Sequence, residues 1–140
     1  MIIVVDANVL FSFFKRDSKV RELILDADRR FNLELKAPKL LTEELGRHKG
    51  EICEKAGISE AGFAFAMAVL KVFVSSVPDK AWLGCKEKAG DLLQGHVKDI
   101  PYIALSIKLN CPLWSNEKRL KMQSQVKVYS TMDLVREFGL

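Results

Sequence analysis

The feature that most constrains the fold is the run of β-branched residues from Ile2 to Val5, which ends directly at Asp6. The run is short and apolar at every position, so we expect a strand that is buried on both faces. Strands of this kind occur in parallel sheets whose two faces are covered by helices. In such sheets ligands bind beyond the carboxyl ends of the strands, and Asp6 stands at that end.

The rest of the chain alternates between helical and strand patterns, without a linker or an internal repeat. The expected helices span residues 18–28, 39–55, 59–73, 78–93, 99–109, 117–122 and 130–138, and the expected strands span residues 2–5, 32–37, 74–77, 112–115 and 126–129. Strands separated by helices imply parallel pairing with right-handed crossovers. We therefore predict the α/β class, as a three-layer α/β/α sandwich with a central, mainly parallel sheet, and interpret residues 1–140 as a single domain.

The composition is that of an ordinary globular protein, with 49% hydrophobic and 29% charged residues, and it excludes a disordered chain. The longest apolar stretch, residues 62–70, is far shorter than the ~20 residues needed to span a bilayer. The N-terminus has no basic segment and no small-residue cleavage site, so no signal peptide is expected. We therefore expect a cytoplasmic protein with no membrane partner.

The cysteines and the net charge narrow the function only slightly. Cys53, Cys85 and Cys111 are widely spaced and odd in number, so we interpret them as buried, reduced thiols. With His48 and His96 they form no pattern of close pairs, which argues against a zinc site. The net charge of +4 is compatible with a polyanionic partner but does not require one.

Three acidic residues stand where a parallel sheet places its ligands. Asp6 follows the first strand, Glu117 follows the strand expected at residues 112–115, and Asp99 begins the helix expected at residues 99–109. Each also has a purely structural interpretation, because an acidic residue can cap a turn or helix or favour the N-terminal end of the helix dipole.

A fourth acidic residue is singled out by the phase of its helix. At ~100° per residue, Glu43 lies opposite the apolar stripe that contains Leu41 and Leu45, whereas Glu44 lies near the edge of that stripe. A carboxylate at the rim of a buried face needs a partner or a cation. Glu44 is therefore the candidate, and Glu43 is expected to face solvent.

Together these four carboxylates would repel one another unless a divalent cation lay among them. A site built from oxygen ligands alone suits Mg²⁺ or Mn²⁺ better than zinc. Two such ions close together are a common apparatus for phosphodiester hydrolysis. The acidic residues therefore indicate a Mg²⁺ or Mn²⁺ cofactor and a reaction of this kind.

Four stretches of the chain resemble the PIN domain, a family that includes the VapC-type ribonuclease toxins of bacteria and archaea. They are VVDANVL at Val4–Leu10, PKLLTEEL at Pro38–Leu45, DIPYIALS at Asp99–Ser106 and LWSNEK at Leu113–Lys118. The stretches come in the order of the family's motifs and span about residues 1–130, which is nearly the whole chain.

The resemblance implies a role for each residue that matches a motif. Asp6 corresponds to the first acidic metal ligand, Glu44 to the helix-borne glutamate, and Asp99 to the third acid in the D-x-P form of its motif. Asn8 corresponds to the small polar residue that supports the first ligand. Ser115, in the last motif, is expected to be a second supporting residue.

The last motif departs from the family pattern. Glu117 stands where the family usually has Asp, and its longer side chain must adopt another rotamer to reach an ion. Just beyond it, Lys118, Arg119 and Lys121 are expected from their charge to bind RNA phosphates. The activity that the resemblance implies is metal-dependent endonucleolytic cleavage of RNA, in which water attacks the phosphorus and leaves a 5′-phosphate and a 3′-hydroxyl.

The resemblance also implies partners, because members commonly form homodimers and are silenced by a cognate antitoxin. We therefore expect RNA, a second copy of the chain and an antitoxin as partners. The apolar helix at residues 61–73 is a candidate interface, although most of it is expected to be core. One non-enzymatic alternative stays open: a PIN scaffold with impaired catalysis that binds RNA or a protein.

Overall fold

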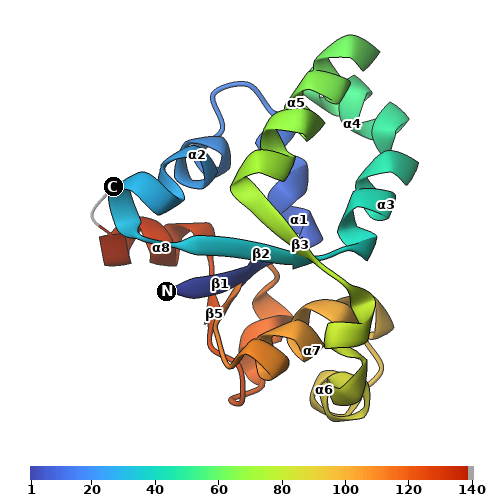
Figure 1. Ribbon diagram of the computed structural model, residues 1–140, viewed down its shortest axis with the longest axis vertical. Coiled ribbons are helices and arrows are strands. Elements are labelled where there is room, and N and C mark those ends of the chain that lie inside the picture. Colours follow the sequence, from blue (N-terminus) through green and yellow to red (C-terminus); the bar gives the residue numbers. More distant parts are fainter. Residues whose placement is uncertain (139–140) are drawn as a thin grey trace.

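The computed structural model describes residues 1–138, which contain one five-stranded sheet in the order β3-β2-β1-β4-β5 (Figure 1). All four strand pairs are parallel. The strands are β1 (Ile2–Val5), β2 (Glu34–Pro38), β3 (Val74–Val77), β4 (Leu113–Trp114) and β5 (Val128–Tyr129). The sequence-based prediction of a parallel sheet with Ile2–Val5 as an interior strand is therefore confirmed.

Helices cover both faces of the sheet and complete the three predicted layers. They are α1 (Ala7–Phe11), α2 (Lys19–Phe31), α3 (Leu40–Arg47), α4 (Lys49–Ala56), α5 (Glu60–Phe73), α6 (Lys86–Leu93), α7 (Ile100–Leu109) and α8 (Thr131–Phe138). Helices α1 to α5 lie on one side of the sheet, and α6 and α7 lie on the other (Figure 1). Helix α7 packs against β1, β2 and β4, and α8 contacts β5 and α2.

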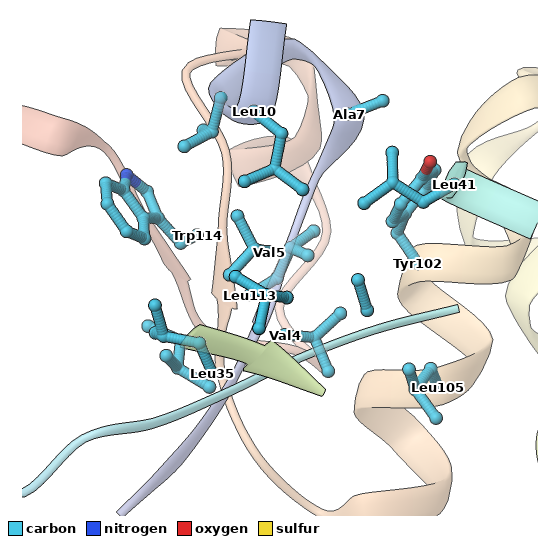
Figure 2. Close-up of a cluster of buried hydrophobic side chains, with 14 of the residues drawn as sticks. Val4, Val5, Ala7, Leu10, Leu35, Leu41, Tyr102, Leu105, Leu113 and Trp114 are labelled. Atoms are coloured by element: carbon cyan, nitrogen blue, oxygen red, sulfur yellow. The ribbon is translucent and has the colours of Figure 1, made fainter. Parts of the chain in front are cut away.

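Both faces of β1 are buried in apolar side chains. Val4 and Val5 have no exposed surface, and neither has Leu113 of the neighbouring strand β4. Figure 2 shows these residues in one cluster with Leu10 of α1 and Leu105 of α7. This packing fixes the carboxyl end of β1, and with it the residue that follows.

The predicted helix at residues 39–55 is in fact two helices, α3 and α4, which meet at His48. At this residue the backbone leaves the helical region, with φ −97° and ψ 13°. Gly46 and Gly50 flank the break, and glycine is the weakest helix former apart from proline. The prediction of one continuous helix is wrong for this reason.

The predicted helix at residues 78–93 is α-helical only in α6. Before α6 the chain forms two 3₁₀ turns, Asp79–Ala81 and Leu83–Cys85, on either side of the buried Trp82. The backbone of Trp82 (φ −106°, ψ −9°) departs from helical geometry, so burial of the indole ring accompanies a bend that ends the first turn.

The segment predicted as a helix at residues 117–122 is a 3₁₀ helix, Lys118–Met122. A segment of this length offers too few hydrogen bonds to offset the cost of nucleating an α-helix. The side chain of Gln123 ends it by donating to the carbonyl oxygen of Leu120 at 2.8 Å.

Helix α1 has no counterpart among the predicted elements. Val9, Leu10, Phe13 and Phe14 are all buried, and their spacing along α1 and the following 3₁₀ turn is helical. The signal was therefore present, but it extends over less than the length of an ordinary helix. The strands predicted at 112–115 and 126–129 also prove shorter, with two residues each in β4 and β5.

Helix α5 is less buried than predicted. Phe63 and Leu70 belong to the core, and the Phe63 ring stacks on that of Phe14 with centroids 5.1 Å apart. In contrast, Phe65 and Val72 are 74% and 78% exposed. Because α5 leads into β3, the edge strand of the sheet, only one of its faces has a layer to pack against.

Two further predictions concern the cysteines and the membrane. Cys53, Cys85 and Cys111 are free thiols as predicted, but they are half-buried rather than buried. Across residues 1–138, no single helix has the length and apolar character to cross a membrane. Helices α4 and α5 meet those criteria only when taken together, as a pair bent by 104°.

Candidate functional site

The centre of the candidate site is Asp6, the residue that links β1 to α1. Its side chain is buried, and the Ser115 hydroxyl donates to its Oδ2 at 2.7 Å. Burial raises the pKa of Asp6 to about 6, and the negative charges of Asp99 and Glu44 act in the same direction, whereas the hydrogen bond from Ser115 lowers it. Asp6 stands at the N-cap position of α1 but makes no side-chain capping bond there.

Ser115 joins three of the residues named by the sequence analysis. Besides donating to Asp6, its Oγ accepts from the Asn8 side-chain amide at 3.4 Å and from the Glu117 backbone N–H at 3.1 Å. The parallel pairing of β1 with β4 brings Ser115 beside Asp6, although the two residues are 109 positions apart. Within the described chain the Asn8 Oδ1 is buried without a hydrogen-bond partner.

Glu44 lies on α3 where the helix phase placed it. Leu41 and Leu45 are buried, Glu43 is exposed, and Glu44 is half-buried at the edge of the apolar stripe. The Tyr102 hydroxyl donates to its Oε2 at 3.1 Å. Glu44 therefore has a neutral hydroxyl donor, as Asp6 does.

Tyr102 is a site residue that the sequence analysis missed. It is 1% exposed and lies on α7, and Figure 2 shows its ring within the buried cluster. Burial holds the pKa of its hydroxyl far above the usual range, and the charge of Glu44 adds to the effect. The hydroxyl therefore stays protonated as a donor. A signal was available, because Tyr102 follows Asp99 by three positions, which is about one helical turn.

Asp99 and Glu117 form the other side of the site, and the positively charged guanidinium of Arg119 lies near both. The Arg119 Nη2 donates to Asp99 Oδ2 at 2.8 Å, and the Arg119 Nε lies 4.0 Å from Glu117 Oε1. The hydrogen bond to Asp99 raises the pKa of the Arg119 guanidinium. Asp99 stands at the N-cap position of α7 and likewise makes no side-chain capping bond there.

The three basic residues expected to bind RNA have different surroundings. Arg119 faces the acidic residues, and Lys121 forms an ion pair with Asp133 of α8. Hydrogen bonds from Lys121 and from the Ser130 backbone lower the pKa of Asp133 to about 2. Lys118 is exposed. The three side chains therefore do not form one continuous basic patch.

The donor chemistry of the site fits a hard divalent ion at the Asp6 end. The candidate ligands are all oxygens, burial and then the nearby negative charges raise the pKa of Asp6, and the Asn8 Oδ1 lacks a partner within the described residues. The side chains as they lie do not form a closed ligand set, since no group of three or more His, Cys, Asp or Glu residues within 1–138 could hold a metal ion. At the Asp99 end the guanidinium of Arg119 is already in contact with the carboxylate.

Comparisons with known proteins identify the family and the fold of the chain. Residues 4–135 match the family model described as PIN domain. A chain of VapBC2 from Rickettsia felis, solved bound to a DNA fragment from their promoter, has a similar fold, with a TM-score of 0.66 and 17% sequence identity over 93% of this chain and 98% of that chain. No curated protein sequence matches. Because the family model covers nearly the whole chain, this protein belongs to the PIN domain family, whose members are generally nucleases.

Proposed function

We propose that this protein is a metal-dependent endoribonuclease that hydrolyses phosphodiester bonds through Asp6, Glu44, Asp99 and Glu117. The observation that carries the proposal is the environment of Asp6. Its carboxylate is buried at the end of the central strand, near the charges of Asp99 and Glu44 from two other elements. Buried carboxylates that repel one another are unfavourable unless a cation compensates them.

Asp6 and Glu44 are the residues that would hold a Mg²⁺ or Mn²⁺ ion most directly, with the Asn8 Oδ1 as a further oxygen nearby. When bound, the ion supplies polarisation of the phosphate and activation of water. Ser115 and Tyr102 each donate one hydrogen bond to these carboxylates and so fix their orientation. The hydrolysis adds water across the P–O3′ bond and leaves a 5′-phosphate and a 3′-hydroxyl.

A cavity beside the site has the character of a nucleic-acid contact. It measures about 290 Å³, and its lining includes Phe11, Lys15, His48 and Lys55, with Glu51 paired to Lys55 at 2.8 Å. The rings of Phe11 and His48 meet edge to face, with centroids 5.6 Å apart. Aromatic rings next to lysines suit a base and its phosphate, which supports RNA as the substrate.

The proposal includes partners of this chain. The fold similarity to a chain of VapBC2 supports a toxin whose partner is a cognate antitoxin. The exposed Phe65 and Val72 on α5 support a protein interface, either with the antitoxin or with a second copy of the chain in a homodimer.

A second candidate function is a PIN scaffold with impaired catalysis that binds RNA or a protein. Two observations favour it. The Arg119 guanidinium forms an ion pair with the Asp99 carboxylate, and Glu117 stands where the family usually has Asp. Replacing Glu117 with Asp separates the candidates, because it should raise Mn²⁺-dependent cleavage by a weakened nuclease and leave a binding module inert.

Cleavage of a pool of structured and single-stranded RNAs in Mn²⁺ tests the proposal. We expect products with 5′-phosphate ends, loss of cleavage with a chelator, and loss of cleavage in Asp6→Asn purified in parallel. Cleavage by Asp6→Asn at a rate close to that of the native protein would show that the activity does not depend on Asp6, and an inert native protein across the pool would contradict the proposal.

A further inference from the structure

We infer that the Arg119 guanidinium takes the place of a second divalent ion, so that the site binds a single Mg²⁺ or Mn²⁺ beside Asp6 and Glu44. The inference rests on the proposed function and specifies how its site is built. Arg119 thereby becomes a positioning residue for the two acidic residues at the far end of the site.

The contacts divide the four carboxylates into two pairs. Asp6 and Glu44 receive hydrogen bonds from neutral hydroxyls, those of Ser115 and Tyr102. Asp99 and Glu117 both face one guanidinium, at 2.8 Å and 4.0 Å. The guanidinium therefore compensates negative charge by direct contact at Asp99 and Glu117, and acts on Asp6 only at longer range.

The position of Arg119 leaves little room for an ion on the same carboxylate oxygen. Mg²⁺ approaches its ligands to ~2.0–2.1 Å. Of the two Asp99 carboxylate oxygens, Oδ2 already accepts from Arg119 Nη2 at 2.8 Å. An ion there would lie next to a like charge and would have to displace the arginine from a side chain that is only 12% exposed.

The local fold holds the guanidinium in this position. Arg119 belongs to the 3₁₀ helix Lys118–Met122, whose Leu120 is buried at 1% exposure. On the other side, the Glu117 backbone is tied to Ser115 by a hydrogen bond of 3.1 Å. The chain is therefore held in place on both sides of Arg119, and from there its side chain contacts Asp99.

The same arrangement gives Glu117 a function. Its side chain is 41% exposed, and its Oε1 lies 4.0 Å from the Nε of Arg119. A carboxylate that pairs with an arginine need not meet the short distances between oxygen and ion that a metal ligand requires. Glutamate in place of the family's usual aspartate is then consistent with a site that holds one ion.

Counting bound Mn²⁺ tests the inference without any need for an RNA substrate. The measurement is isothermal titration of the metal-free protein with Mn²⁺, with free Mn²⁺ checked by its EPR signal. We expect one ion for the native protein and two for Arg119→Gln. Arg119→Lys, which keeps the positive charge, should again bind one ion. Lys118→Gln is the matched control, because it removes the same charge from the exposed neighbouring residue, and it should also bind one.

Two results would overturn the inference while leaving the proposed function standing: two ions in the native protein, or one ion in Arg119→Gln. Circular dichroism checks that Arg119→Gln is folded, and Arg119→Met, which keeps the length of the side chain, takes its place if it is not. No binding by the native protein or any variant would overturn both the inference and the metal-dependent nuclease.

Discussion

The two ends of the acidic site differ in what holds their carboxylates. Asp6 is 4% exposed and bonded to a serine hydroxyl, and its pKa is raised by burial and by neighbouring acids. Asp99 is also buried, but it is bonded to Arg119. The difference shows that a cluster of acidic residues can be partly neutralised from within the chain, so the number of carboxylates alone does not give the number of ions.

The largest effect is expected from Asp6→Asn, which removes the buried carboxylate that would hold the ion most directly. RNA cleavage should fall by about 10³-fold or more, because an ion contributes several kcal/mol of transition-state stabilisation and each ~1.4 kcal/mol is tenfold in rate. Initial cleavage rates in Mn²⁺ measure the effect. A loss of less than tenfold would mean that Asp6 is not the principal ligand.

A pH series on the metal-free protein measures how far folding raises the pKa of Asp6. The pKa of Asp6 is about 6 in the folded protein and near its ordinary value of 3.8 when unfolded, so the folded state binds the proton more tightly. The free energy of unfolding should therefore fall as pH rises from about 4 to 6, by up to ~3 kcal/mol relative to Asp6→Asn.

Urea titrations of the native protein and Asp6→Asn at several pH values give this difference. Since both proteins share every other titrating group, the difference isolates Asp6. Parallel stability curves for the two proteins would show that folding does not raise the pKa of Asp6.

The neutral donors at this end should each matter less than Asp6 itself. Tyr102→Phe removes the hydroxyl from Glu44 and leaves the buried ring in place. Cleavage should fall by roughly 10–100-fold, as for other residues that orient a metal ligand. Stability should change by only about 1 kcal/mol. Equal cleavage rates for Tyr102→Phe and the native protein would remove Tyr102 from the site.

The smallest effects are expected from the lysines. Neutralising Lys15, beside the Asp6 end, or Lys118, beside the Asp99 end, should each reduce the slope of log affinity for RNA against log salt by about 1. Lys121→Gln is the control, because Lys121 is paired with Asp133 and should leave the slope unchanged. A change of slope with Lys121→Gln alone would place the RNA on the opposite side of the 3₁₀ helix.

Much of the fold could be predicted because its elements carry strong local signals. Strand β1 is an unbroken β-branched run, and α2 and α5 begin at serines whose side chains accept from the N–H groups of Arg21 and Gly62. The break at His48 has a local signal in the flanking Gly46 and Gly50, but the spacing of apolar residues does not report it. The 3₁₀ turns near Trp82 accompany burial of its ring, which depends on tertiary packing.

The same division applies to the site. The position of Asp6 could be predicted from its place after a buried strand, and that of Glu44 from its phase on a helix. The ion pair of Arg119 with Asp99 joins residues 20 positions apart and depends on how a 3₁₀ helix aims one side chain. From charge alone, Arg119 was assigned to RNA phosphates, since no local pattern indicates that an arginine turns toward an acid of another segment.

Thermal unfolding with and without millimolar Mn²⁺, on the native protein and on Asp6→Asn, tests most directly whether the acidic site binds a cation. An ion at ~100 times its dissociation constant adds ~2.7 kcal/mol to the stability of the folded state. The native protein should therefore unfold a few degrees higher in Mn²⁺, and Asp6→Asn should not. If Mn²⁺ leaves both melting temperatures unchanged, or raises both equally, Asp6 holds no ion and the metal-dependent mechanism is wrong.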